Sequence, residues 1–131
     1  MGAAADAFAA HVRAWNSRSR AEWLTLFHED IEMEDPVGGV PKRGREALAT
    51  TWERSQTNDR RWTLHPQRVV EGGNEAAIVL LNRGELPDGN VEVTSIEIWR
   101  VDAAGKVVSI RTFFDTDPAV HDPYYLPAAA G

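Results

Sequence analysis

Asp35 is the residue of this sequence best placed to act as a base. It stands directly before a proline in the stretch IEMEDPVGG, residues 31–39, where acidic side chains alternate with apolar ones. A residue before proline is pushed toward extended conformations, which limits where its side chain can point. In an apolar pocket, burial would raise the pKa of this carboxyl group toward the range that suits a general base. The plainer alternative is a solvated acidic turn, since Glu32 and Glu34 precede Asp35.

His11 falls on the apolar stripe of a helix predicted near the start of the chain. Phe8, His11, Val12 and Trp15 recur there at helical spacing. A histidine on such a stripe is usually a core residue with its hydrogen bonds satisfied. If it points into a pocket, it could instead donate a hydrogen bond to a developing oxyanion, or shuttle a proton.

Two further polar residues lie on apolar strand faces, Thr94 beside Ile96 and Asn82 beside Leu80. Either side chain could orient a carbonyl or hydroxyl group of a ligand, although Thr is common in strands and Asn can bond to neighbouring backbone. Aromatic walls would favour flat or polycyclic apolar ligands. The residues predicted to bind the substrate are Trp15, Phe27, Trp52, Leu80, Asn82, Ile96 and Phe114.

No metal or organic cofactor is predicted. His28, His65 and His121 lack a second histidine three or four residues away, and the chain has no cysteine. It also lacks a G-x-S-x-G nucleophile elbow and a glycine-rich phosphate-binding loop.

The elements that must position these residues change type near residue 61. Before it we predict three helices: one ending at Asn16, one over residues 20–30 opened by a Ser19–Glu22 capping box, and one over residues 45–56. After it come four strands, at 62–73, 75–86, 90–102 and 106–117, separated by plausible hairpin turns. This order predicts an α+β fold, in which the helices pack on a strongly curved, mainly antiparallel sheet and close a cone with an apolar interior.

Alternation along the strands defines two faces but not which of them is inward. We expect Thr94, Ile96 and Phe114 to face the interior. The opposite face carries Glu97, Trp99, Arg111 and Phe113, a mixture of large apolar and charged groups. Such a mixture favours a homodimer interface on the outer face of the sheet.

Length and charge exclude several classes of protein. The 131 residues fit one domain, 1–131, with a C-terminal tail at 118–131. The net charge of −6 and the lack of a basic stripe argue against nucleic-acid binding. No apolar run is long enough to cross a membrane, and the absence of cysteine suits a reducing cytoplasm. A small apolar molecule is therefore the expected partner.

Two long segments resemble a known family. Residues 14–48, AWNSRSRAEWLTLFHEDIEMEDPVGGVPKRGREAL, and residues 96–114, IEIWRVDAAGKVVSIRTFF, are similar to ketosteroid isomerase-like and SnoaL-like proteins, which share the cone-shaped α+β fold of nuclear transport factor 2. The resemblance implies that Asp35, in the E-D-P motif, is the general base. It also places the family's two oxyanion donors, a tyrosine and an acid, at His11 and Thr94. By this comparison Asp35 keeps the family's general base, whereas His11 and Thr94 replace the family's two oxyanion donors.

Three hypotheses for function follow. The favoured one is a cofactor-independent isomerase or cyclase, in which Asp35 moves a proton next to a carbonyl while His11 with Thr94 or Asn82 steadies the oxygen. The second is epoxide opening or hydration, which needs a second acid in the pocket, and none lies on the faces predicted to be inward. The third is a ligand-binding or dimerisation module without catalysis.

Overall fold

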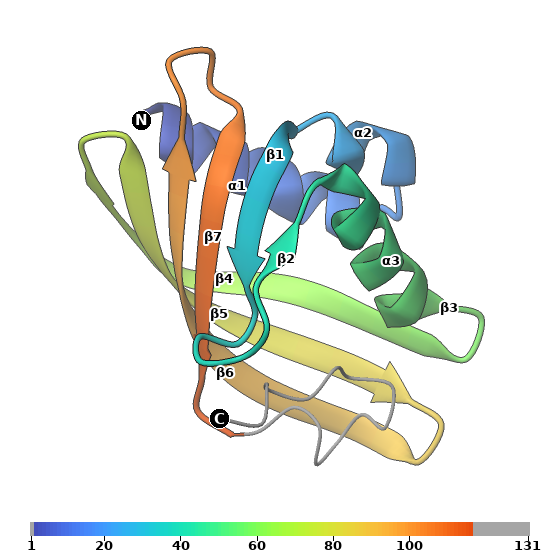
Figure 1. Cartoon of the computed structure of the whole chain (residues 1–131). Coiled ribbons are helices and arrows are strands. Elements are labelled where there is room, and N and C mark those ends of the chain that lie inside the picture. The colour runs from blue at the N-terminus through green and yellow to red at the C-terminus, as the bar shows by residue number, and fades with distance from the viewer. Residues whose placement is uncertain (1, 117–131) are drawn as a thin grey trace.

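Three helices lie against the concave face of one curved sheet (Figure 1). The computed structural model describes residues 2–116. The helices are α1 (Ala3–Asn16), α2 (Arg20–Leu24) and α3 (Arg45–Ser55). None of the helices in this part of the chain is long and apolar enough to span a membrane. The tail predicted at 118–131, with His121, lies outside the described residues.

The sheet has seven strands in the order β2-β1-β7-β6-β5-β4-β3. β1 (Phe27–Glu34) pairs with β7 (Val107–Phe114) in parallel, and every other pair is antiparallel. β4 (Arg60–Gly72), β5 (Glu75–Leu86), β6 (Gly89–Val101) and β7 form the predicted meander, and β2 (Lys42–Arg43) and β3 (Gln56–Thr57) are short edge strands. The predicted α+β cone is therefore confirmed.

A bulge in β4 helps to bend the sheet around the helices. Pro66 pairs with Leu80 and Arg68 with Val79, so Gln67 is an extra residue in the ladder. Bulges bend a strand and increase its twist. A proline has no N–H to donate to a neighbouring strand, so it is tolerated at such an irregularity.

The second helix is shorter than predicted. It ends at Leu24, and Phe27 already begins β1. Phe27 and Ile31 are both fully buried, and their spacing of four residues resembles a helix. A spacing of four residues is also two full periods of a strand, so both side chains lie on the inner face of β1. Ser19 precedes α2 as predicted, but its side chain makes no capping hydrogen bond.

Aromatic rings fill the space between α1, α2, α3 and the sheet. Trp99 from β6 meets the Phe8 ring edge-on at 5.2 Å, and Trp23 from α2 packs on Phe27 at 4.8 Å. Trp52 from α3 closes the same cluster against Trp23. These contacts hold the three helices on the sheet and leave a hollow beside them.

Candidate functional site

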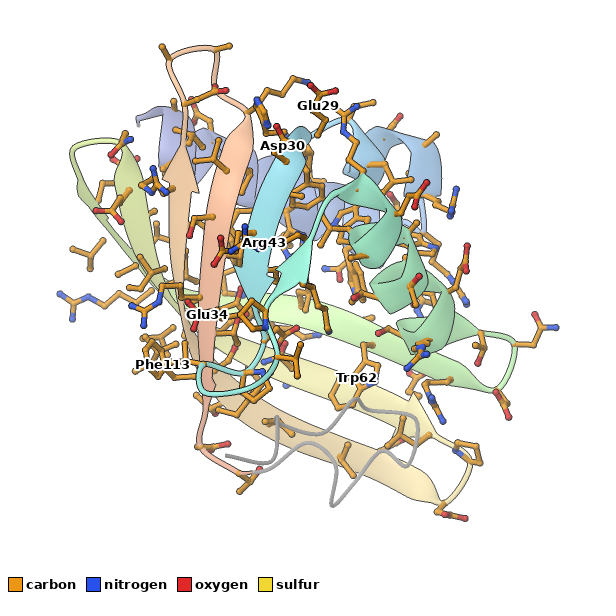
Figure 2. The ribbon with its side chains drawn as sticks, viewed as in Figure 1. Glu29, Asp30, Glu34, Arg43, Trp62 and Phe113 are labelled. Atoms are coloured by element: carbon orange, nitrogen blue, oxygen red, sulfur yellow. The ribbon has the colours of Figure 1, made fainter. Side chains whose placement is uncertain are left out.

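A cavity of about 140 Å³ lies between the helices and the concave face of the sheet. Its volume is close to that of a dry apolar cavity of about 150 Å³ that holds benzene in another protein. Four tryptophans contribute to its mostly apolar lining: Trp15, Trp23, Trp62 and Trp99. Figure 2 shows Trp62 on the side of the sheet that faces α3. Such walls suit an apolar, flat guest molecule.

Asp35 lines this cavity at the end of β1. The residue as a whole is half-buried, but its Oδ1 atom is buried. Burial raises the pKa of the Asp35 carboxyl group, and the positive charge of Lys42 on β2 partly lowers it. The pKa of the Asp35 carboxyl group is thus brought toward the range that suits a general base, while the nearby cation favours its charged form.

Glu97 on β6 is a second carboxyl group in the same cavity, and it is 7% exposed. Trp99 Nε1 donates to its Oε1 at 2.9 Å, and Ser95 Oγ donates to its Oε2 at 3.0 Å. Burial raises the pKa of Glu97 to about 7; the two hydrogen bonds lower it, while the charge of Asp35 raises it. Near neutral pH this group is therefore partly protonated, and its protonated form has an O–H to donate.

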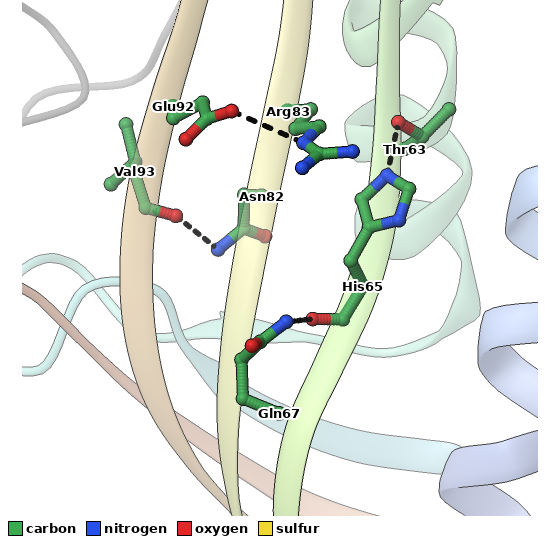
Figure 3. Close-up of polar contacts among 7 residues, drawn as sticks. All are labelled: Thr63, His65, Gln67, Asn82, Arg83, Glu92 and Val93. Atoms are coloured by element: carbon green, nitrogen blue, oxygen red, sulfur yellow. Dashed lines mark hydrogen bonds and ion pairs between the residues drawn. The ribbon is translucent and has the colours of Figure 1, made fainter.

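Asn82 on β5 extends the polar network from Glu97. Its Nδ2 donates to the backbone oxygen of Val93 at 3.0 Å, as Figure 3 shows, and to Ser95 Oγ at 2.9 Å. Ser95 Oγ therefore accepts from Asn82 and donates to Glu97. This chain of hydrogen bonds fixes the orientation of the buried carboxyl group.

His11 enters the cavity from α1 and is 8% exposed. Trp23 Nε1 donates to His11 Nδ1 at 2.8 Å. Burial lowers the pKa of His11 to about 3, so the ring is neutral at physiological pH. A neutral imidazole that accepts at Nδ1 carries its proton on Nε2 and can donate from there.

Two residues predicted for the site lie elsewhere, and we correct their placement. Ile96 is 49% exposed, and Thr94 is half-buried with its backbone N–H donating to Asp115. The inner face of β6 instead carries Ser95, Glu97 and Trp99. Period-2 alternation separates the two sets correctly, but the set that faces inward is the one with Glu97, not the predicted one with Thr94.

The other predicted residues divide between the cavity and the core behind it. Trp15, Asn82 and Phe114 line the cavity. Phe27, Trp52 and Leu80 are buried in the aromatic and aliphatic core, and they are not among the described residues that line it. That these three contact a ligand directly stays a prediction.

Glu97 is the functional candidate that the sequence analysis missed. A signal was present in the full length of β6. The residues of β6 that share a face with Glu97 include Val93, Trp99 and Val101, toward the two ends of the strand. The residues on the opposite face include the charged Glu92 and Arg100. The first set is the more apolar one, and a sheet buries its more apolar face.

No group of three or more metal-ligating side chains is placed to hold a metal ion within residues 2–116.

Comparison with known protein families agrees with this arrangement. A family model described as a SnoaL-like domain matches residues 8–110, which include most of α1, all of β4 to β6, the start of β7 and every residue of the site except Thr112 and Phe114. The chain belongs to the SnoaL-like family. The resemblance read from residues 14–48 and 96–114 is thereby confirmed.

Solved structures share the fold of this SnoaL-like domain. The Δ5-3-ketosteroid isomerase from a Mycobacterium species is 25% identical, with a TM-score of 0.76 over 86% of this chain and 93% of that one. RV0760c from Mycobacterium tuberculosis, solved in complex with estradiol-17beta-hemisuccinate, is 24% identical, with a TM-score of 0.79 over 89% and 97%. An LEH-like epoxide hydrolase of the same organism is 20% identical, with a TM-score of 0.74 over 89% of this chain and 83% of that one.

Proposed function

We propose that this protein catalyses proton transfer next to a carbonyl group of a small apolar substrate, with Asp35 as the general base. The observation that carries the proposal is the meeting of Asp35, Glu97 and His11 in one apolar cavity. They differ in electrostatic environment: a carboxyl group whose pKa is raised by burial and partly lowered by Lys42, a carboxyl group with a pKa of about 7, and an imidazole that is neutral at physiological pH. Groups whose environments separate their pKa values in this way are suited to different acid–base roles.

The reaction would begin with removal of a proton from the carbon next to the carbonyl. Asp35 accepts that proton, and the electron pair of the C–H bond moves to give an enolate. The carbonyl oxygen gains negative charge, which the O–H of Glu97 and the Nε2–H of His11 stabilise. Return of the proton to another carbon isomerises a double bond. Alternatively, the enolate attacks a second carbonyl group of the substrate, and the resulting alkoxide takes the proton back from Asp35 to give a cyclised aldol. Glu97 takes the position that the sequence analysis had given to Thr94.

Similarity to a ketosteroid isomerase and to a protein bound to an estradiol derivative supports an apolar, ring-containing carbonyl compound as substrate. The tryptophan walls of the cavity support the same choice, because flat rings pack well against indoles.

The test is exchange of substrate carbon-bound hydrogen for solvent deuterium, followed by NMR on a panel of cyclic enones. A general base contributes about 10²–10⁴-fold, so we expect Asp35→Asn to lower the exchange rate by about that factor while folding and ligand binding persist. The matched control is Glu34→Gln, which alters the neighbouring acid that pairs with Arg111 at 3.3 Å on the surface. Full exchange by Asp35→Asn would overturn the role of Asp35. Saturable binding without exchange by the unmodified protein would favour a ligand-binding module.

Epoxide opening is the second candidate, because the structure supplies the second pocket acid that it needs. In this reaction Asp35 would activate a water and Glu97 would protonate the epoxide oxygen. Turnover in ¹⁸O-labelled water distinguishes the two: hydration places the label in the product diol, whereas isomerisation creates no new C–O bond to solvent oxygen.

We also propose a homodimer formed through the outer face of the sheet. Ile96 on β6 and Phe113 on β7 are register partners there and are 49% and 43% exposed. Arg111 lies 5.6 Å from the centre of the Phe113 ring. Exposed apolar and arginine side chains on one face are typical of protein–protein interfaces. Glu97 and Trp99, which the sequence analysis placed on this face, lie inside.

A further inference from the structure

The hydrogen bond between Trp23 and His11 decides which ring nitrogen of His11 can donate a hydrogen bond to a ligand in the cavity. His11 lies on α1 and Trp23 on α2, and the turn between them brings the indole N–H to 2.8 Å from Nδ1. An indole nitrogen only donates hydrogen bonds. Nδ1 must therefore hold its lone pair toward Trp23, and the proton of the neutral ring sits on Nε2.

The surroundings of the His11 ring also favour its neutral form. His11 lies within an aromatic cage, with ring centres of Phe8 at 5.5 Å and Trp99 at 4.6 Å. A protonated imidazole would place an N–H opposite the N–H of Trp23, and its charge would be poorly solvated among these rings. The titratable groups that share its cavity are Asp35 and Glu97. Their attraction for a cation is outweighed by burial, since burial lowers the pKa of His11.

We propose that Trp23 is a positioning residue that locks His11 in its Nε2–H tautomer, so that His11 acts as a neutral hydrogen-bond donor and not as a proton shuttle. A shuttle would have to accept a proton at a ring nitrogen. Nδ1 is occupied by the indole, and Nε2 already carries a proton. The use of this donor on a carbonyl oxygen rests on the function proposed above, but the tautomer itself does not.

The first measurement needs no variant. In uniformly ¹⁵N-labelled protein, a hydrogen bond between two nitrogens transmits a scalar coupling, and the ¹⁵N shifts of the ring report the tautomer. We expect coupling between Trp23 Nε1 and His11 Nδ1, with His11 neutral and protonated at Nε2 from about pH 5 to pH 8. A proton on Nδ1, or titration of His11 within that interval, would overturn the proposal.

The second measurement compares Trp23→Phe with Trp52→Phe. Trp52 belongs to the same cluster, 5.2 Å from Trp23 between ring centres, so both variants lose one indole from the same core. We expect only Trp23→Phe to give a mixture of His11 tautomers and a raised His11 pKa. If folded Trp23→Phe keeps the same His11 tautomer, Trp23 does not determine that tautomer and the proposal is wrong.

Kinetic measurements test whether the Trp23–His11 hydrogen bond affects turnover. With Trp23→Phe, we expect kcat to fall between about twofold, for equally populated tautomers, and about 100-fold, for complete loss of one oxyanion donor, with KM little changed. A fall of the same size in Trp52→Phe would assign the effect to general packing and refute a positioning role. If the tautomer is as proposed but the unmodified protein exchanges no substrate hydrogen, the positioning stands and the proposed function fails.

Discussion

Asp35, directly after β1, and Glu97, on β6, line one cavity, and the negative charge of Asp35 raises the pKa of Glu97. Two carboxyl groups that interact in this way lose their protons in sequence. Lys42 favours charge on Asp35, so we expect Asp35 to ionise first. Between the two ionisations the pair then consists of one carboxylate and one protonated acid, which is the combination that proton transfer to and from carbon requires.

Activity should fall as pH rises through the pKa of Glu97, because the O–H that stabilises the oxyanion is lost near pH 7. Glu97→Gln retains a neutral donor of similar shape, so we expect its rate to stay within about tenfold of the original and its alkaline fall to disappear. Glu97→Ala should lose about 10²–10³-fold at every pH. The pH–rate profiles of kcat check this. An alkaline fall that persists in Glu97→Gln would assign it to another group.

Lys42→Met should move the acidic limb of the same profile to higher pH. Removing the cation leaves burial as the main influence on Asp35, so the pKa of its carboxyl group rises further. Arg43→Met is the matched control, because Arg43 is the next residue on β2 and pairs with Glu32 at the surface. The rate at the plateau should be similar in both variants. Equal shifts in the two variants would point to net charge and not to the neighbourhood of Asp35.

Glu97 and His11 should give opposite slopes to stability against pH. Glu97 keeps its proton to about pH 7 in the folded state but to about 4.5 when unfolded, so its contribution is full at low pH and is lost as pH rises between these values. His11, neutral down to about pH 3 when folded, contributes stability that is lost as pH falls from 6.5 to 3. Each effect is on the order of 3–5 kcal/mol.

Denaturant titrations of Glu97→Gln and His11→Asn at several pH values separate the two slopes. Relative to the unmodified protein, the free energy of unfolding of Glu97→Gln should rise with pH between about 4.5 and 7. That of His11→Asn should fall with pH between about 3 and 6.5. Parallel curves for a variant and the unmodified protein would show that the group concerned has the same pKa in both states.

Gly84→Ala should change ligand selection. A Cβ at Gly84 would lie 2.9 Å from Cη2 of Trp62, its register partner on β4, so the ring that walls the cavity must move. Loss of part of an aromatic contact is expected to change the dissociation constant of a flat ligand about two- to tenfold. Gly72→Ala is the control, because no atom lies within 4 Å of its added Cβ. Calorimetry measures both; identical affinities would show that Trp62 does not contact the ligand.

Ile96→Glu should separate the proposed homodimer into monomers, since it puts a negative charge beside the exposed Phe113 ring on the outer face of the sheet. Val40→Glu places the same charge on another exposed apolar residue, in the loop before β2, and should leave the dimer intact. Light scattering after gel filtration gives the masses. A monomeric unmodified protein at micromolar concentration would contradict the proposal.

The turn residues and the strand periods made the meander predictable from sequence, because hairpin turns and two-residue alternation are local properties. The boundary between α2 and β1 was not predictable in the same way. A spacing of four residues, as between Phe27 and Ile31, fits one face of a helix and one face of a strand, and only the pairing of this segment with β7 decides for the strand. Local spacing is therefore ambiguous for a short apolar segment.

The sequence by itself determined the fold family, the proline-flanked carboxylate at Asp35 and the histidine on the helix stripe. The tertiary structure decided that Glu97, and not Thr94, is the cavity partner on β6. Alternation sorts side chains into two sets, but which set is buried depends on the side of the sheet that the helices cover, and that is a relation between distant parts of the chain. The proton states of His11 and Glu97 were also decided there, because they depend on burial and on neighbours such as Trp23 that folding brings together.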